Sequence, residues 1–241
     1  MGLLPPHELR RLDALASPDR PLEELIRRRV EGEPLQYIEG SAAFADLELV
    51  VDERVIVPRP ETEGLFEIAT KMVRHPTVIV DLCTGSGALA LALKKTYPNA
   101  SVFAVDLSEE AIEVATANMY KTGLSIYFAV GDLFDPLPAS LLGEVDLLVA
   151  NPPYVAEAEY SSLPADVRRE PKMALVAGPT GLEVIQQIGA SVSQWLRPGG
   201  VVICEIGETQ GAPAVACFED LPAVIRQDLN GRDRYLVAVK P

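Results

Sequence analysis

Short apolar runs alternate with amphipathic segments from residue 77 onward, and this rhythm limits the possible folds more than any other feature. Five runs have the length of buried strands: residues 78–80, 101–105, 126–130, 145–149 and 201–206. Three helical patterns lie between them, at residues 87–96, 109–122 and 181–196. Strands that alternate with helices in this way form a parallel sheet, which right-handed crossovers cover on both faces.

Two further strand-like runs close the chain, at residues 223–227 and 235–239, with Asn230-Gly231 between them. The connection is too short for a helical crossover, so these strands should pair antiparallel at an edge of the sheet. We therefore predict an α/β fold with a Rossmann-like, seven-stranded, mostly parallel sheet and an antiparallel edge strand.

The first sixty residues follow a different pattern. Helices are predicted near residues 6–16 and 21–31, followed by a hairpin with strands at residues 44–51 and 54–57 and a turn at Asp52-Glu53. The predicted organisation has three parts: a short helical segment at residues 1–40, a β-hairpin linker at residues 41–60 and the α/β domain at residues 61–241.

The composition argues against several classes of function. A net charge of −14 would repel a nucleic-acid duplex, so direct nucleic-acid binding is not expected. The two histidines and three cysteines are scattered, which argues against a metal site and against a disulfide framework. No apolar run approaches the ~20 residues that span a bilayer. The N-terminus lacks the basic flank and apolar stretch of a signal peptide, so we expect a cytoplasmic protein without membrane contact.

A glycine-rich loop, Asp81-Leu82-Cys83-Thr84-Gly85-Ser86-Gly87, follows the first core strand. Glycines let the backbone approach a ligand closely, and the amides at the start of the next helix face that ligand. The second strand ends at Asp106, where a carboxylate can accept hydrogen bonds from ribose hydroxyls. These features predict a nucleoside cofactor but do not separate NAD from S-adenosylmethionine. A tight turn without a ligand is the alternative.

The tetrapeptide Asn151-Pro152-Pro153-Tyr154 follows the fourth strand directly, at the same edge of the sheet. The Asn151 side-chain oxygen and the Pro152 carbonyl can both accept hydrogen bonds from one planar NH2 group, against which Tyr154 can stack. Two such acceptors favour positive charge on a weakly nucleophilic amide nitrogen as it attacks a methyl group held in line. The motif predicts methyl transfer to a planar amide or amine nitrogen. A proline turn that only ends a strand is the alternative.

From about Gly32 to the C-terminus, the sequence resembles the protein-(glutamine-N5) methyltransferases of the HemK or PrmC family. Besides the two loops above, the resemblance rests on Gly-Glu-Pro-Leu-Gln-Tyr-Ile at 32–38, Pro-Arg-Pro-Glu-Thr-Glu at 58–63, Glu-Ile-Gly at 205–207 and Asn-Gly-Arg-Asp-Arg at 230–234. It implies a class I methyltransferase sheet that uses S-adenosylmethionine, yields S-adenosylhomocysteine and needs no metal. It also implies the family's substrate and partner, the glutamine of the Gly-Gly-Gln loop in peptide chain release factors.

The resemblance further implies roles for individual residues. Cofactor binding would fall to Asp81, Cys83, Thr84, Gly85, Ser86 and Gly87 around the methionine part, Asp106 and Leu107 at the ribose, Asp132 and Leu133 beside the adenine, and Asn151. The target amide would be held by Asn151, Pro152, Pro153 and Tyr154, of which Asn151, Pro152 and Tyr154 would be catalytic. Arg59 and Pro60 would line the mouth of the active site.

Two features depart from the family pattern. Cys83 stands where a glycine is usual, so its side chain is expected to crowd the cofactor loop. About forty residues precede the hairpin, whereas family members usually carry a longer helical N-terminal domain. Four alternatives therefore stay open: a glutamine methyltransferase with another protein target, a nucleic-acid amino-methyltransferase with the same tetrapeptide, an NAD-dependent oxidoreductase, and a non-catalytic protein that binds the cofactor.

Overall fold

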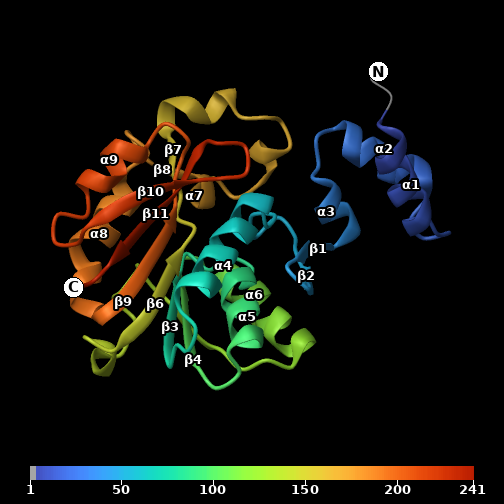
Figure 1. Ribbon diagram of the computed structural model, residues 1–241. Helices are drawn as coiled ribbons and strands as arrows, with labels where there is room; N and C mark the ends of the chain where they lie inside the picture. The colour runs from blue at the N-terminus through green and yellow to red at the C-terminus, as the bar shows by residue number, and fades with distance from the viewer. Residues whose placement is uncertain (1–3) are drawn as a thin grey trace.

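A computed structural model describes residues 4–241, and its centre is a seven-stranded sheet (Figure 1). The strand order is β10-β11-β9-β6-β3-β4-β5. The strands are β3 (Val78–Leu82), β4 (Ser101–Asp106), β5 (Tyr127–Val130), β6 (Val145–Ala150), β9 (Leu196–Glu205), β10 (Ala223–Gln227) and β11 (Asp233–Val239). All seven predicted strands are present, and β3 and β6 in the middle of the sheet are buried along almost their whole length between two helical layers.

Helices cover both faces of this sheet, as predicted (Figure 1). On one face lie α4 (Pro60–Met72), α5 (Ala88–Thr96) and α6 (Glu109–Thr122). On the other lie α8 (Glu183–Trp195) and α9 (Gly211–Ala216). Two apolar cores result, one built on α4 and α5 and one on α8 and α9. None of the helices between residues 4 and 241 has the length and apolar character needed to cross a bilayer.

The two closing strands pair antiparallel at an edge of the sheet, as predicted. The antiparallel strand β11 is nevertheless second from the edge, because β10 lies outside it and β9 inside it. The burial pattern gives the reason. Residues 235–238 of β11 are buried, whereas Val224 of β10 is 54% exposed. The more apolar strand therefore takes the covered position.

The N-terminal part contains α1 (Pro6–Leu15), α2 (Leu22–Val30) and the short α3 (Leu35–Glu39), of which only α3 was not predicted. A hairpin of β1 (Ser41–Phe44) and β2 (Leu47–Val50) follows. The hairpin lies within the predicted residues 41–60, but its predicted strands and turn were wrong, because the turn lies at Ala45-Asp46 and residues 54–57 form no strand. Ala45 has a left-handed φ of 50°, and its N–H donates to Glu63 Oε1 at 2.8 Å. A turn held by a distant carboxylate, without glycine, leaves no local signal in the sequence.

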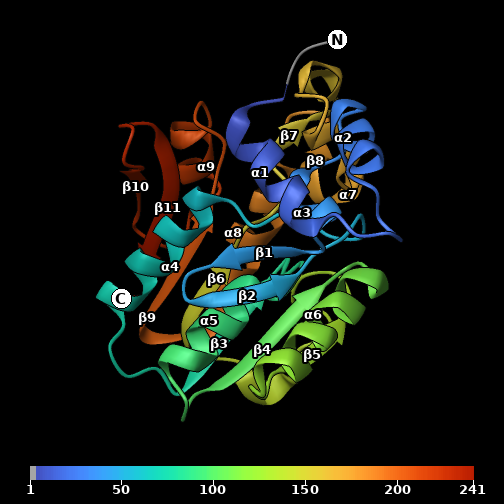
Figure 2. The same ribbon diagram turned by 90° about the vertical axis from the view of Figure 1, so that its right-hand side faces the viewer.

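Asn118 of α6 joins the hairpin to the glycine-rich loop, and β2 lies beside α6 (Figure 2). Its Oδ1 accepts from the Val50 N–H at 2.6 Å, and its Nδ2 donates to the carbonyls of Val50 and Ser86, each at 3.0 Å. The side chain is fully buried. The hairpin is thereby fixed to the glycine-rich loop that contains Ser86.

A segment that the sequence did not predict follows the Asn-Pro-Pro-Tyr tetrapeptide. Its elements are β7 (Val155–Ala156), η2 (Glu157–Ser162), η3 (Val167–Arg169), α7 (Lys172–Leu175) and β8 (Val176–Gly178). The N-terminal helices hold this segment, since Arg29 lies 3.7 Å from Asp166 and Arg169 donates to the Glu31 carbonyl at 3.0 Å. The segment therefore lies between the N-terminal helices and the end of β6.

Candidate active site

The candidate site lies where the strand order reverses. Strand β3 pairs in parallel with β4 on one side and with β6 on the other. Ligands of such sheets bind at the carboxyl ends of the strands beside this point. The glycine-rich loop after β3, Asp106 at the end of β4 and Asn151 after β6 all line one cavity there. The three motifs singled out in the sequence are thus brought together.

The glycine-rich loop is built from left-handed backbone. Cys83, Gly85 and Gly87 have φ values of 58°, 55° and 80°. The Gly87 N–H donates to the Thr84 carbonyl at 2.9 Å and closes the turn into α5. A Cβ added to Gly85 would meet no atom within 4 Å, so the loop leaves open space on its cavity side. The backbone is therefore accessible to a ligand that approaches it closely. The two cavities that the loop lines measure about 40 and about 30 Å³, so a nucleoside-sized cofactor requires them to widen.

Asp106 is held beside that loop with both carboxylate oxygens in use. The Gly85 N–H donates to Oδ2 at 2.8 Å, and the Ser108 N–H donates to Oδ1 at 2.9 Å. Each oxygen keeps a lone pair for a further donor, so the carboxylate suits the hydroxyls of a ribose. Burial raises the pKa of Asp106. The next residue, Leu107, is 60% exposed and offers an apolar surface beside this carboxylate.

Asp81 supports the loop from inside the sheet. Its Oδ2 accepts from the Thr84 hydroxyl at 2.6 Å and from the Ala90 N–H at 3.1 Å. Its Oδ1 is buried and has no hydrogen-bond partner among the residues that the structure describes. Burial raises the pKa of Asp81 to about 7. The ionised carboxylate is therefore costly at this position.

This cost predicts a pH-dependent stability. The pKa of Asp81 rises from 3.8 to about 7 on folding, so the folded protein keeps a proton that the unfolded chain loses, and the free energy of unfolding falls as pH rises through this window. An asparagine does not ionise. The free energy of unfolding of Asp81→Asn minus that of the wild type should therefore rise by at least ~1 kcal/mol between about pH 4 and about pH 8. Urea unfolding at both pH values tests this, and a constant difference would contradict it.

Cys83 lines both cavities beside the loop, and the expected crowding of a bound cofactor by its side chain stays a prediction. Burial raises the pKa of its thiol, which therefore stays protonated. Cys83→Gly should lower the Kd for S-adenosylmethionine by about 2- to 5-fold, because glycine adopts positive φ freely and removes a side chain from the cavity wall. Isothermal titration measures the change. Weaker binding by Cys83→Gly would instead identify the thiol as a favourable contact.

Asn151 stands between two spaces. It lines the cavities on the glycine-loop side with Cys83 and Gly85, and also a separate cavity of 280 Å³ with Arg59 and Tyr154. Its Nδ2 donates to the Thr62 hydroxyl at 3.1 Å. No described residue donates a hydrogen bond to its Oδ1. One end of the amide is therefore fixed and the other remains available as an acceptor.

Tyr154 also contributes to the wall of the 280 Å³ cavity. Its hydroxyl donates to Glu205 Oε1 at 3.4 Å, and its carbonyl accepts from Gln210 Nε2 at 2.9 Å. Burial raises the pKa of this phenol, so it remains a neutral donor. One contact holds the hydroxyl on the ring and the other holds the backbone of the same residue. The ring is therefore fixed in place, as a surface for stacking requires.

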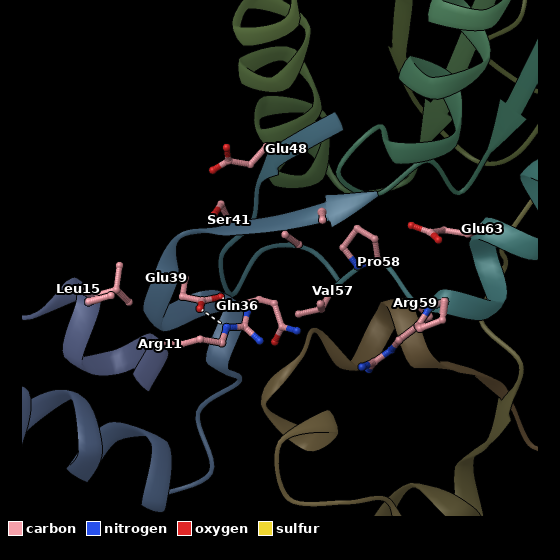
Figure 3. Close-up of a pocket in the computed structure, with 14 residues that line it drawn as sticks. Arg11, Leu15, Gln36, Glu39, Ser41, Glu48, Val57, Pro58, Arg59 and Glu63 are labelled. Atoms are coloured by element: carbon pink, nitrogen blue, oxygen red, sulfur yellow. Dashed lines mark hydrogen bonds and ion pairs between the residues drawn. The ribbon is translucent and has the colours of Figure 1, made fainter. Parts of the chain in front are cut away.

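Arg59 lines both this cavity and a larger groove. It donates to Glu170 Oε2 at 2.7 Å, a carboxyl whose pKa burial raises to about 7. The groove has a volume of 730 Å³ and lies between the N-terminal helices, the hairpin and the start of α4 (Figure 3). Arg11, Gln36 and Glu39 line one side of it, and Arg59, Pro60 and Glu63 line the other. Arg59 and Pro60 both line this groove, and only Arg59 also lines the 280 Å³ cavity, so their place at the mouth of the active site stays a prediction.

Other residues lie outside these cavities or were not foreseen. The cavities beside the glycine loop include neither Asp132 nor Leu133 in their walls, and Leu133 is part of an apolar core, so their contact with adenine stays a prediction. Sequence analysis assigned no role to Thr62, Glu170 or Glu205. For Glu205 a signal existed, because a charged residue follows the apolar run at residues 201–204 and ends the strand at the ligand edge of the sheet.

Residues 4–241 contain no group of three or more histidine, cysteine, aspartate or glutamate side chains that could hold a metal ion.

The comparisons with known proteins agree with the geometry. A family model described as "Methyltransferase small domain" matches residues 65–178. A release factor glutamine methyltransferase of Nitratidesulfovibrio vulgaris is 39% identical over 95% of this chain and 83% of that relative. The enzyme of the same name from Streptomyces coelicolor is 42% identical over 90% of this chain and 79% of that relative.

Solved structures share the fold at lower identity. A methyltransferase from Pyrococcus furiosus matches with a TM-score of 0.61 and 16% identity, over 89% of this chain and 97% of that one. The Thermus thermophilus 16S rRNA N2 G1207 methyltransferase, solved with AdoMet and guanosine, matches with a TM-score of 0.60 and 19% identity, over 83% of this chain and 50% of that one. Both likenesses concern the fold alone.

Proposed function

Because this chain belongs to the release factor glutamine methyltransferase family and is an S-adenosylmethionine-dependent methyltransferase, we propose that it methylates the side-chain amide nitrogen (N5) of a protein glutamine. The proposed target is the glutamine of the Gly-Gly-Gln loop in a peptide chain release factor. The observation that carries this proposal is the place of Asn151, whose side chain borders both the space beside the glycine loop and the 280 Å³ cavity.

We assign the cofactor to the glycine-loop side of Asn151. The open cradle at Gly85 and the free lone pairs of Asp106 suit S-adenosylmethionine, with Asp106 and Leu107 at the ribose. Cys83, Thr84, Gly85, Ser86 and Gly87 would hold the methionine part. When bound, the cofactor supplies an electrophilic methyl group and leaves as S-adenosylhomocysteine.

The other side of Asn151 would take the glutamine. Asn151 Oδ1 and the Pro152 carbonyl accept the two hydrogens of the target NH2 group, and the Tyr154 ring stacks on its plane. These acceptors orient the nitrogen lone pair and stabilise the positive charge that grows on nitrogen during attack. A methylated, charged amide loses its proton readily to water. No strong base is then required, in keeping with the distance of His7 and His75 from the tetrapeptide in the sequence.

A protein substrate suits the surroundings better than a nucleic acid. The net charge of −14 disfavours a polyanion. The 730 Å³ groove meets the 280 Å³ cavity at Arg59 and could guide an extended peptide loop toward Asn151. A glutamine methyltransferase with another protein target would use the same geometry, and so would an amino-methyltransferase acting on nucleic acid. The substrate must therefore be tested directly.

The test is a methyl-transfer assay with purified release factor, an unrelated protein, RNA and DNA as separate substrates. We expect the release factor alone to gain the mass of one methyl group, and peptide mass spectrometry to locate it on the Gly-Gly-Gln glutamine. A release factor with this glutamine replaced by glutamate should gain nothing. Methylation of RNA or DNA, or of another protein in preference, would overturn the proposed substrate.

A further inference from the structure

The side chains of Asn151, Thr62 and Glu205, which come from distant parts of the chain, form a hydrogen-bonded row that starts at the tetrapeptide. Asn151 Nδ2 donates to the hydroxyl of Thr62, at 3.1 Å. That hydroxyl in turn donates to Glu205 Oε2 at 2.8 Å. Thr62 and Glu205 are 4% and 1% exposed, so water does not compete for these contacts. The row joins the start of α4 and the end of β9 to the loop after β6.

The order of donors in this row is fixed when Glu205 is ionised. A threonine hydroxyl has one hydrogen, and an ionised carboxylate can only accept. Burial raises the pKa of Glu205 to about 7, so this order holds above that pH. Once the Thr62 hydrogen points to Glu205, only a lone pair of Thr62 faces Asn151. The side-chain amide of Asn151 must then turn its NH2 group toward Thr62. The reversed rotamer would set the Asn151 oxygen against that lone pair, with no hydrogen between the two oxygens, and is therefore disfavoured.

Glu205 also acts on the other end of the tetrapeptide. Its second oxygen, Oε1, accepts from the Tyr154 hydroxyl at 3.4 Å. One buried carboxylate therefore holds both Asn151, through Thr62, and Tyr154 directly. Neither Thr62 nor Glu205 needs to touch the substrate to have this effect.

We infer that Thr62 and Glu205 are positioning residues, which fix the Asn151 amide with its oxygen toward the target nitrogen and its NH2 group away from it. The inference rests on the proposed function, since it concerns the nitrogen that Asn151 is proposed to bind. A misoriented Asn151 would present its own N–H groups to the N–H groups of the target. The pair therefore selects the one side-chain orientation that can accept a hydrogen bond from a planar NH2 group.

A double-mutant cycle tests the inference with full-length protein, S-adenosylmethionine and release factor. Thr62→Val keeps the shape of the side chain and removes its hydroxyl. We expect kcat to fall about 10- to 100-fold in the wild-type background and less than about 2-fold in the Asn151→Ala background, because the loss acts through Asn151. Single-turnover rates give both values. Equal losses in the two backgrounds would overturn the inference.

Companion variants separate orientation from damage to the fold. Thr62→Ser keeps the hydroxyl and should recover most of the activity, and Thr70→Val on the same helix should leave transfer unchanged. The Kd for S-adenosylmethionine should remain close to the wild-type value in every Thr62 variant. If Thr62→Val does not fold, Thr62→Ala replaces it in the cycle. Wild-type protein that fails to methylate release factor would refute the proposed function, whereas active wild type with fully active Thr62→Val would refute only this inference.

Discussion

Replacing Asn151 with alanine should lower kcat for methyl transfer by about 10²–10³-fold, as expected for the loss of one preorganised polar contact to the transition state. The side-chain oxygen of Asn151 is proposed to accept a hydrogen from the target amide, and this contact strengthens as positive charge develops on nitrogen. The carbonyl of Pro152 remains, so some activity should persist. Single-turnover rates with saturating release factor measure the effect.

Asn151 also borders the cofactor side, so affinity must be measured beside rate. Isothermal titration with S-adenosylmethionine should give nearly the wild-type Kd for Asn151→Ala. The exposed Asn99 provides a matched control, and Asn99→Ala should change neither quantity. Unchanged turnover in Asn151→Ala would remove this residue from the mechanism. A large loss of cofactor affinity without a loss of saturated rate would reassign it to the cofactor wall.

Asp106→Ala is expected to act on binding first. A hydrogen bond to a charged group contributes ~1.5–3 kcal/mol, so loss of the proposed contacts to the ribose should raise the Kd for S-adenosylmethionine by about 100-fold. The variant also frees the amides of Gly85 and Ser108 that now donate to this carboxylate. At saturating cofactor, kcat should fall much less, because the ribose lies away from the reacting methyl group.

Two further proteins make the Asp106 result specific. Asp106→Asn keeps one acceptor oxygen and should bind the cofactor with intermediate affinity. Asp220→Ala removes an exposed carboxylate of the same kind and should behave as the wild type. Normal cofactor affinity in Asp106→Ala would contradict the ribose assignment. Tighter binding of NAD than of S-adenosylmethionine by the wild type would contradict the cofactor itself.

The central sheet could be predicted because its strands are buried on both faces. Such strands leave continuous apolar runs in the sequence, as in β6 and β9, and the helices between them fix a parallel order. The hairpin could not be placed correctly, since its turn depends on Ala45 in a left-handed conformation and on a contact with Glu63. The segment after the tetrapeptide is similar, because long-range contacts of Arg29 and Arg169 hold its short helices.

In the site, too, features with a local signal in the sequence could be predicted, and features that depend on long-range contacts could not. The carboxyl ends of parallel strands meet at one edge, so the glycine-rich loop, Asp106 and Asn151 could be expected to lie together, and one cavity contains all three. The row from Asn151 through Thr62 to Glu205 could not be foreseen in the same way. Thr62 and Glu205 are 143 residues apart, and only the packing of α4 against β9 brings them into contact.

The most direct measurement is a crystal structure of the protein with S-adenosylhomocysteine and a peptide containing Gly-Gly-Gln. We predict that the glutamine NH2 group donates to Asn151 Oδ1 and to the Pro152 carbonyl, with its nitrogen directed toward the sulfur of the product cofactor. Asn151 Nδ2 should keep its contact with Thr62. A glutamine bound away from the tetrapeptide, or one whose carbonyl oxygen rather than its nitrogen faces Asn151, would contradict this account.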